Sequence, residues 1–172
     1  LKGQLGSGFV PVPATKTPSV ELPRLVAVGV STGGPDALGE VLAALPVGFP
    51  AAVVVAQHIA AEYAPGLAEA LAPRCRLPVR TARGGDVPQP GVVYIAATDD
   101  HLELAADLRL RYTPTPKSAP YRPSADVLFG SLAARSPRPG VGVLLTGMGT
   151  DGAEGLLKLR QTGWHTIAQD EA

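Results

Sequence analysis

The stretch LVAVGVSTGGPDALGEVLAAL, residues 25–45, decides the fold class of this chain. Its first six residues form a continuous apolar run, which is typical of a strand buried on both faces of a parallel sheet. The turn STGG follows at residues 31–34, and residues 35–45 have the apolar spacing of an α-helix with Pro in its first turn. The stretch therefore predicts a buried strand that leads through a tight turn into a helix.

The same alternation of strand and helix continues to the end of the chain. Further strands are expected at residues 51–56, 77–81, 92–96, 141–145 and 164–168, and further helices at 63–71, 124–134 and 151–161. Residues 101–105 and 108–112 flank a short turn and predict an antiparallel hairpin. Alternating units of this kind imply an α/β fold: a doubly wound, mostly parallel sheet with helices on both faces and one small hairpin. Ligands of such sheets bind at the carboxyl ends of the strands.

Composition and charge restrict the class of protein. The 172 residues are enough for one domain with a hydrophobic core, and the 45% of apolar residues exclude disorder of the chain as a whole. Fifteen basic residues balance fifteen acidic ones, which argues against a nucleic-acid binder, and a single Cys excludes a disulfide framework and a Cys-rich metal site. No apolar run reaches the roughly 20 residues of a membrane span, and no signal-peptide pattern is present. We therefore expect a cytoplasmic protein without membrane insertion.

The start of the chain differs in composition from the remainder. Residues 1–23 are rich in Pro, Ser, Thr and Gly and poor in large apolar side chains. Such a segment cannot bury enough surface to order itself. We expect a flexible linker or tail there, followed by one domain over residues 24–172.

Gly29, Ser31 and Gly33 form the motif G-x-S-x-G between the first expected strand and helix. In this position the motif makes a tight turn that exposes the Ser hydroxyl, and the helix N-terminus offers N–H groups to a developing oxyanion. The pattern favours Ser31 as a nucleophile. Two alternatives remain, a Gly-rich turn that binds phosphate and a plain connection. The turn is not G-x-G-x-x-G and no G-K-S or G-K-T follows it, which weakens the nucleotide-binding alternative.

A serine nucleophile needs a base, and the chain has three His. His58 follows the expected strand at 51–56, which a right-handed connection places beside the strand of Ser31. His101 lies near the hairpin, and His165 lies inside the last expected strand, where a structural role is favoured. The spacing therefore favours His58.

The third group should be a carboxylate that fixes the tautomer of the imidazole. Asp151 lies past the carboxyl end of the strand at 141–145, but it also begins an N-capping box with Glu154. Asp99, Asp100 and Asp126 are competitors by position, and spacing alone does not choose among the four.

Six blocks of the sequence are similar to the catalytic domain of the chemotaxis protein-glutamate methylesterase (CheB-type) family. The blocks are VGVSTGG (28–34), VVVAQHI (53–59), YIAATDDHLEL (94–104), YRPSADVLF (121–129), VLLTGMGTDGAEG (143–155) and TIAQDEA (166–172). The resemblance covers residues 25–172 in order, and six blocks in one order are far more specific than any single block.

The resemblance implies hydrolysis of glutamate γ-methyl esters on the cytoplasmic helices of methyl-accepting chemotaxis receptors, and possible deamidation of receptor glutamines. The family's nucleophile, base and carboxylate fall on Ser31, His58 and Asp151. The backbone N–H of Met148 corresponds to a proposed oxyanion donor, together with the Ser31 turn, and Thr32 corresponds to a Thr beside the nucleophile. No metal or organic cofactor is implied. A receiver domain and a histidine kinase are implied upstream in the pathway, and the family's further C-terminal segment leads us to expect a truncated end.

Two rival functions come from other readings of the same turn. The first is a serine hydrolase that acts on other esters or on peptides. The second is a non-catalytic α/β module that binds a phosphate or nucleotide at the Ser31 turn. Reaction with a fluorophosphonate distinguishes the second rival, because only an activated Ser reacts.

Overall fold

The computed structural model describes residues 21–147 and 149–170 of the chain. Its strands are β1 (Arg24–Val30), β2 (Ala51–Gln57), β3 (Val79–Thr81), β4 (Val93–Ile95), β5 (His101–Leu104), β6 (Leu110–Thr113), β7 (Val141–Leu144) and β8 (His165–Ala168). Its helices are α1 (Gly34–Ala44), α2 (Ala64–Leu71), α3 (Ala125–Arg135) and α4 (Ala153–Gln161), with short 3-10 turns η1 (Ala61–Tyr63) and η2 (Ala72–Arg74) on either side of α2. Every predicted strand and helix is present, with shifted ends.

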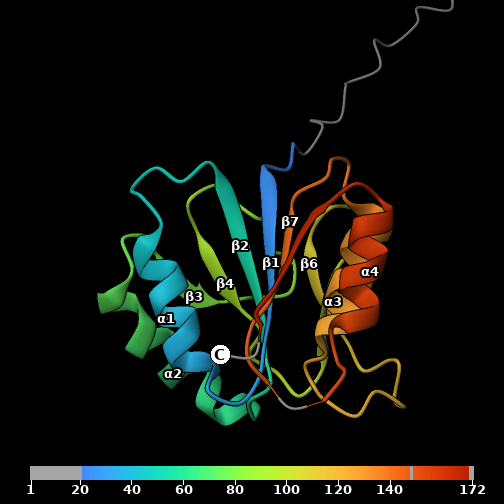
Figure 1. The fold of residues 1–172 in the computed structure, drawn as a ribbon, viewed down its shortest axis with the longest axis horizontal. Coiled ribbons are helices and arrows are strands. Elements are labelled where there is room, and N and C mark those ends of the chain that lie inside the picture. The colour runs from blue at the N-terminus through green and yellow to red at the C-terminus, as the bar shows by residue number, and fades with distance from the viewer. Residues whose placement is uncertain (1–20, 148, 171–172) are drawn as a thin grey trace, which may run out of the picture.

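Six of the strands form one sheet in the order β3-β4-β2-β1-β7-β8, and all neighbours in it are parallel (Figure 1). β5 and β6 pair as a separate antiparallel hairpin. The predicted fold class, a doubly wound and mostly parallel sheet with a small hairpin, is confirmed. The side-by-side placement of β1 and β2, on which the choice of His58 depends, is also confirmed.

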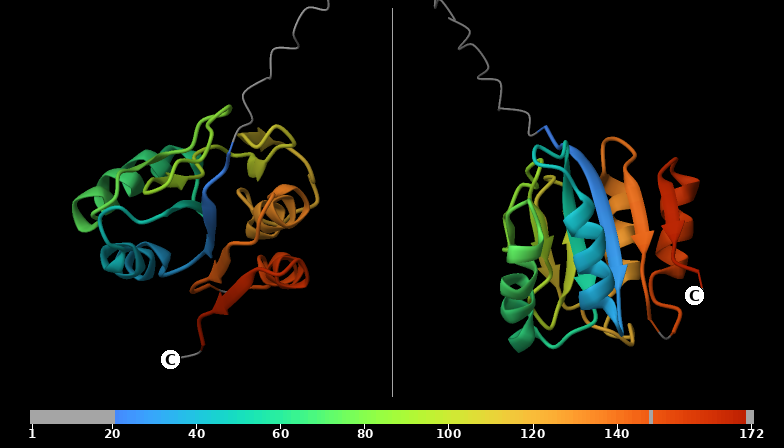
Figure 2. Two further views of the ribbon diagram at one scale, coloured as in Figure 1. Left: turned by 90° about the horizontal axis from the view of Figure 1, so that it is seen from above. Right: turned by 60° about the vertical axis from the view of Figure 1, so that its left-hand side comes forward.

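Helices cover both faces of the sheet (Figure 2). On one face, Leu38 and Leu42 of α1 and Leu67 and Leu71 of α2 pack against the valines of β1 and β2. On the other face, α3, α4 and the hairpin enclose a second core. Because β2 is buried along its whole length, its sequence is apolar on both faces rather than alternating.

The order of the strands reverses between β1 and β7. From β1 the chain moves through β2 toward β4 and β3, and it returns with β7 on the opposite side of β1. Loops that leave two neighbouring strands in opposite directions open a crevice at the carboxyl end of the sheet. The loops that follow β1, β2 and β7 meet at this end.

The edge strand β8 leaves most of its side chains exposed. We expected a structural role for His165 inside this strand. The imidazole is exposed, and His165 takes part in the sheet through its backbone N–H, which donates to the Gly140 carbonyl (3.1 Å). Ile167 of the same strand is 46% exposed.

The predicted linker over residues 1–23 lies mostly outside the described residues. Leu22 is described and belongs to the buried core, so packing begins before the first strand. Within residues 21–147 and 149–170, no helix has the length and apolar character needed to cross a membrane.

Two glycines predict opposite effects of the same substitution on stability. A Cβ at Gly140 would lie 2.1 Å from the backbone carbonyl oxygen of Leu25, which cannot move without disturbing the sheet. We expect Gly140→Ala to lower the free energy of unfolding by about 3 kcal/mol. A Cβ at Gly130, inside α3, meets no atom within 4 Å. Gly130→Ala should therefore raise the free energy by about 0.5–1 kcal/mol, and urea denaturation measures both. Equal effects of the two substitutions would contradict this account.

Candidate active site

The Ser31 turn is fixed by hydrogen bonds to the segment that follows β7. The Ser31 N–H donates to the Thr146 carbonyl (2.9 Å), and the Leu145 N–H donates to the Gly29 carbonyl (2.9 Å). Gly33 adopts a φ of 75°, a conformation that favours glycine. A Cβ at Gly29 would lie 2.7 Å from the Cβ of Ala125, so the first glycine of the motif allows α3 to approach the sheet.

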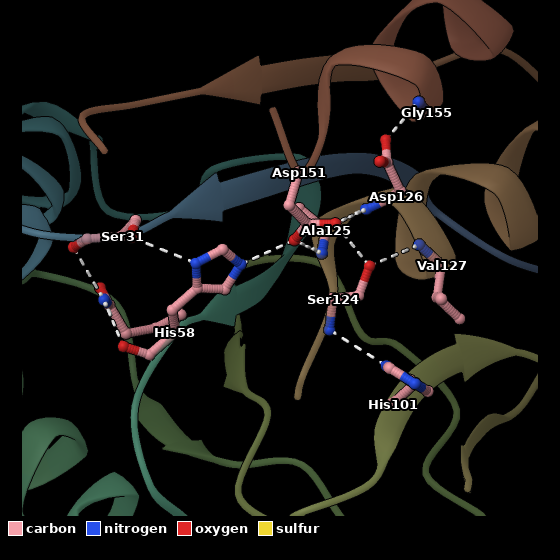
Figure 3. Close-up of polar contacts among 10 residues, drawn as sticks. Ser31, His58, His101, Ser124, Ala125, Asp126, Val127, Asp151 and Gly155 are labelled. Atoms are coloured by element: carbon pink, nitrogen blue, oxygen red, sulfur yellow. Dashed lines mark hydrogen bonds and ion pairs between the residues drawn. The ribbon is translucent and has the colours of Figure 1, made fainter. Parts of the chain in front are cut away.

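The imidazole of His58 lies between the Ser31 hydroxyl and the Asp151 carboxylate (Figure 3). Its Nδ1 is 3.1 Å from Ser31 Oγ, and its Nε2 is 2.6 Å from Asp151 Oδ2. An ionised carboxylate can only accept a hydrogen bond, so this network assigns the proton of neutral His58 to Nε2. The lone pair of Nδ1 then faces the Ser31 hydroxyl, as a general base requires.

Asp151 is anchored at the N-terminus of α3, the helix that precedes it in the chain. Its carboxylate accepts hydrogen bonds from Ser124 Oγ (2.6 Å), the Ala125 N–H (2.7 Å) and the Asp126 N–H (3.3 Å). The predicted capping box with Glu154 is wrong: Gly152, which has no side chain, is the N-cap of α4. The backbone has turned the carboxylate toward α3, where it meets unpaired N–H groups and the positive end of the helix dipole.

The surroundings of Asp151 favour its ionised form. Burial raises the pKa of the Asp151 carboxyl, but hydrogen bonds from His58, Ser124 and the backbone of α3 outweigh burial and hold the pKa below its usual value. Only 4% of the side chain is exposed, so these bonds are weakly screened by solvent. The carboxylate is therefore charged at neutral pH, as a group that stabilises an imidazolium must be.

This lowered pKa predicts how Asp151 affects stability in acid. A carboxyl whose pKa is lower in the folded than in the unfolded state stabilises the fold above the unfolded value, about 3.9 for Asp, and loses that contribution as the pH falls through the folded value. We expect the difference in unfolding free energy between the unchanged chain and Asp151→Asn to be largest above about pH 5. It should shrink as the pH falls below about 4. Denaturation between pH 3 and 7 measures it, with Asp99→Asn as the matched control; a pH-independent difference would refute the expectation.

Ser124 contacts Asp151 directly, and His101 supports Ser124. Ser124 is the N-cap of α3, and its Oγ accepts from the Val127 N–H (3.3 Å). The same hydroxyl donates to Asp151, a second role that the capping pattern does not reveal. His101 is fully buried, its Nδ1 accepts from the Ser124 N–H (3.2 Å), and its Nε2 lies 3.2 Å from the Pro116 carbonyl oxygen. His101 is therefore a support of the site and is not in contact with Ser31.

The competing carboxylates lie away from the imidazole. Asp99 is exposed, and within residues 21–147 and 149–170 its carboxylate accepts a hydrogen bond from the Ala61 N–H alone (3.4 Å). Asp126 Oδ1 accepts from the Gly155 N–H (2.6 Å) and so joins α3 to α4. Asp100 is half-buried, and no hydrogen bond to its carboxylate is found among the described residues. Of the four candidates, only Asp151 is brought to His58.

Gln57 is a site residue that the sequence reasoning missed. Its buried amide donates through Nε2 to the Ser31 carbonyl (2.9 Å), and its Oε1 has no partner among the described residues. A Cβ at Gly34 would lie 2.4 Å from that Oε1, so the second glycine of STGG makes room for the amide. A polar side chain that ends an otherwise apolar strand, directly before His58, was the available signal.

The expected oxyanion donors are placed only in part. Met148 lies outside the described residues. Within the Ser31 turn, the Ser31 N–H donates to the Thr146 carbonyl and is therefore not a free donor. Thr32 is exposed, and its carbonyl accepts from Thr146 Oγ1. Ser31, His58 and Asp151 line a small cavity of about 60 Å³ together with residues of the loop after β7, including Gly147 and Gly149.

Comparison with known proteins identifies the family. The CheB methylesterase family model matches residues 26–172. The chain belongs to the CheB methylesterase family. The crystal structure of the Thermotoga maritima CheB methylesterase catalytic domain superposes with a TM-score of 0.80 at 36% sequence identity, over 86% of this chain and 80% of that one.

Curated relatives of this CheB domain are longer than the chain. It is 53% identical over 168 residues to protein-glutamate methylesterase/protein-glutamine glutaminase 2 of Cupriavidus metallidurans, which covers 97% of the chain and 50% of the relative. It is 52% identical over 162 residues to protein-glutamate methylesterase/protein-glutamine glutaminase 4 of Burkholderia thailandensis, over 94% of the chain and 47% of the relative. The chain thus spans about half the length of the curated relatives it matches.

Proposed function

We propose that this chain is a protein-glutamate methylesterase that removes methyl groups from glutamate γ-methyl esters on the cytoplasmic helices of chemoreceptors. The observation that carries the proposal is the hydrogen-bonded series Ser31–His58–Asp151 in a domain of the CheB methylesterase family. A cavity of about 60 Å³ suits the end of one side chain rather than a large ligand. Because the proposed substrate lies on cytoplasmic helices, the enzyme of this proposal acts in the cytoplasm.

Acylation begins with proton transfer from Ser31 to His58. As Oγ attacks the ester carbonyl carbon, Nδ1 of His58 takes the hydroxyl proton, and Asp151 stabilises the imidazolium through Nε2–H. The carbonyl oxygen becomes an oxyanion. We assign its stabilisation to the Met148 N–H and to the N–H groups of Thr32 and Gly33. The N–H groups of Thr32 and Gly33 make no hydrogen bond in the described part of the chain.

Collapse of the tetrahedral intermediate breaks the bond to the methoxy oxygen. His58 returns its proton to that oxygen, and methanol leaves a glutamyl ester on Ser31. Water then attacks the acyl carbon while His58 again takes a proton, and release of Ser31 gives the glutamate carboxylate. With a glutamine substrate the same steps release ammonia, which is the chemistry named for the relatives.

The proposed partners follow from the same substrate. They are the methylated receptor helices, with a receiver domain and a histidine kinase upstream. Support comes from the family and from curated relatives about twice as long as this chain.

Methanol release from a methylated receptor cytoplasmic fragment tests the proposed function. We expect the unchanged chain to release one methanol for each methyl ester lost from the fragment, and Ser31→Ala to release none above background. A panel of soluble methyl, ethyl and aryl esters is run in parallel, and ammonia release from an unmodified fragment tests the glutaminase reaction. Turnover of soluble esters without turnover of the receptor would favour a serine hydrolase of other specificity, and absence of fluorophosphonate labelling would favour a binding module.

A further inference from the structure

A tyrosine ring covers one face of the His58 imidazole. The ring of Tyr121 lies parallel to it, with centroids 4.2 Å apart and an angle of 7° between the planes. Tyr121 is half-buried and precedes Ser124 by three residues, in the loop between β6 and α3. The two rings therefore come from segments that are far apart in the chain.

The loop that carries Tyr121 is fixed on both sides of this ring. Before it, the Pro116 carbonyl oxygen lies 3.2 Å from Nε2 of the buried His101. After it, Ser124 Oγ donates to Asp151 (2.6 Å). Tyr121 Oη would lie 3.2 Å from a Cβ at Gly149, so the ring is enclosed between the imidazole and the loop after β7. Its position is thus determined by the same network that holds the carboxylate.

Hydrogen bonds alone resist one motion of the imidazole only weakly. The N–H and the lone pair of an imidazole lie in the plane of its ring, and His58 contacts Ser31 (3.1 Å) and Asp151 (2.6 Å) through these two groups. They set the direction of the two nitrogen atoms within that plane, but they resist tilting about the line that joins the partners only weakly. A flat ring packed face to face resists this tilt, and the negative π face of a phenol also attracts the positive charge of an imidazolium.

We propose that Tyr121 is a positioning residue that keeps the imidazole of His58 in line between Ser31 and Asp151 and favours its protonated form during acylation. The inference rests on the proposed function only in taking Ser31 as the nucleophile and His58 as its base. The hydroxyl of Tyr121 makes no hydrogen bond within residues 21–147 and 149–170, so the aromatic face, rather than the phenol oxygen, carries the effect.

Conservative and non-aromatic substitutions separate the face from the hydroxyl. Tyr121→Phe keeps the ring, and Tyr121→Leu keeps an apolar side chain without a π face. We expect the rate of Ser31 labelling by a fluorophosphonate, followed by intact mass, to stay within about twofold for Phe and to fall about tenfold for Leu. With methylated receptor fragment, kcat should fall in parallel while KM changes less than about twofold. Thermal unfolding of both variants is measured beside the rates.

A double substitution tests whether Tyr121 acts through His58. In the His58→Ala background, Tyr121→Leu should cause no further loss of the residual labelling rate, because the group through which it acts is gone. A further loss there, an unchanged rate for Leu, or an equal loss for Phe would each overturn the inference. Labelling needs no receptor, so normal labelling effects without methanol release would refute the proposed function and leave this inference standing.

Discussion

Ser31→Ala and His58→Ala are each expected to lower the rate of methyl ester hydrolysis by about 10³-fold or more. The first removes the nucleophile, and the second removes the base 3.1 Å from it. What remains is catalysis by substrate binding and the oxyanion donors. Methanol release at substrate concentrations well below KM, where the rate is proportional to kcat/KM, measures both effects. Because the two groups act as one unit, the double variant should be hardly slower than either single one.

Two observations would contradict this assignment. The first is substantial turnover by Ser31→Ala in a preparation free of other esterases. The second is a loss in the double variant equal to the product of the single losses, which would place the groups in independent steps. His101→Gln is a useful comparison, because this buried His touches Ser124 and Pro116 rather than Ser31. It should lower stability more than it lowers the rate.

Asp151→Asn is expected to lower turnover by more than about tenfold, but by less than Ser31→Ala or His58→Ala. The amide keeps the shape of the side chain but removes the negative charge and allows the wrong tautomer of His58. The effect on the rate should be smaller than that of His58→Ala, since the base itself remains. Turnover and melting temperature must be measured together, because the carboxylate also accepts hydrogen bonds at the start of α3.

Asp99→Asn and Asp126→Asn are the matched controls. Both should keep turnover within a few-fold of the unchanged chain. Asp126→Asn should reduce stability more than Asp99→Asn, since it alters the bond to the Gly155 N–H (2.6 Å) that joins two helices. Near-normal turnover of Asp151→Asn with a large loss in Asp99→Asn would exclude Asp151 as the carboxylate.

The fold could be predicted from the sequence because local patterns of apolar residues indicate it. Apolar runs marked the buried strands, and their alternation with helices fixed the sheet type. The same reasoning placed Ser31 and His58 at neighbouring strand ends, which the parallel pairing of β1 and β2 explains. Spacing could not choose Asp151 over Asp99, because both follow strands. That choice depends on which loop lies near the place, between β1 and β7, where the order of the strands reverses.

The supporting residues of the site depend on contacts that no local pattern encodes. Ser124 has the pattern of a helix cap, yet its hydroxyl also serves a carboxylate 27 positions away. Gln57 and Tyr121 reach Ser31 and His58 through a buried amide and a stacked ring. Asp151 fitted a capping box by spacing, but a neighbouring helix offered more donors. Tertiary alternatives of this kind outweigh local preference.

The central position of β1, with β2 on one side and β7 on the other, has a consequence for a chain emerging from the ribosome. Once β1 and β2 have been synthesised, the nucleophile and its base can already be neighbours. The carboxylate that orients the base lies 93 positions after His58 and arrives only when β7 docks on the free side of β1. A partly synthesised chain therefore carries a serine without full activation. Hydrolysis by the proposed mechanism would then begin only after β7 has taken its place beside β1.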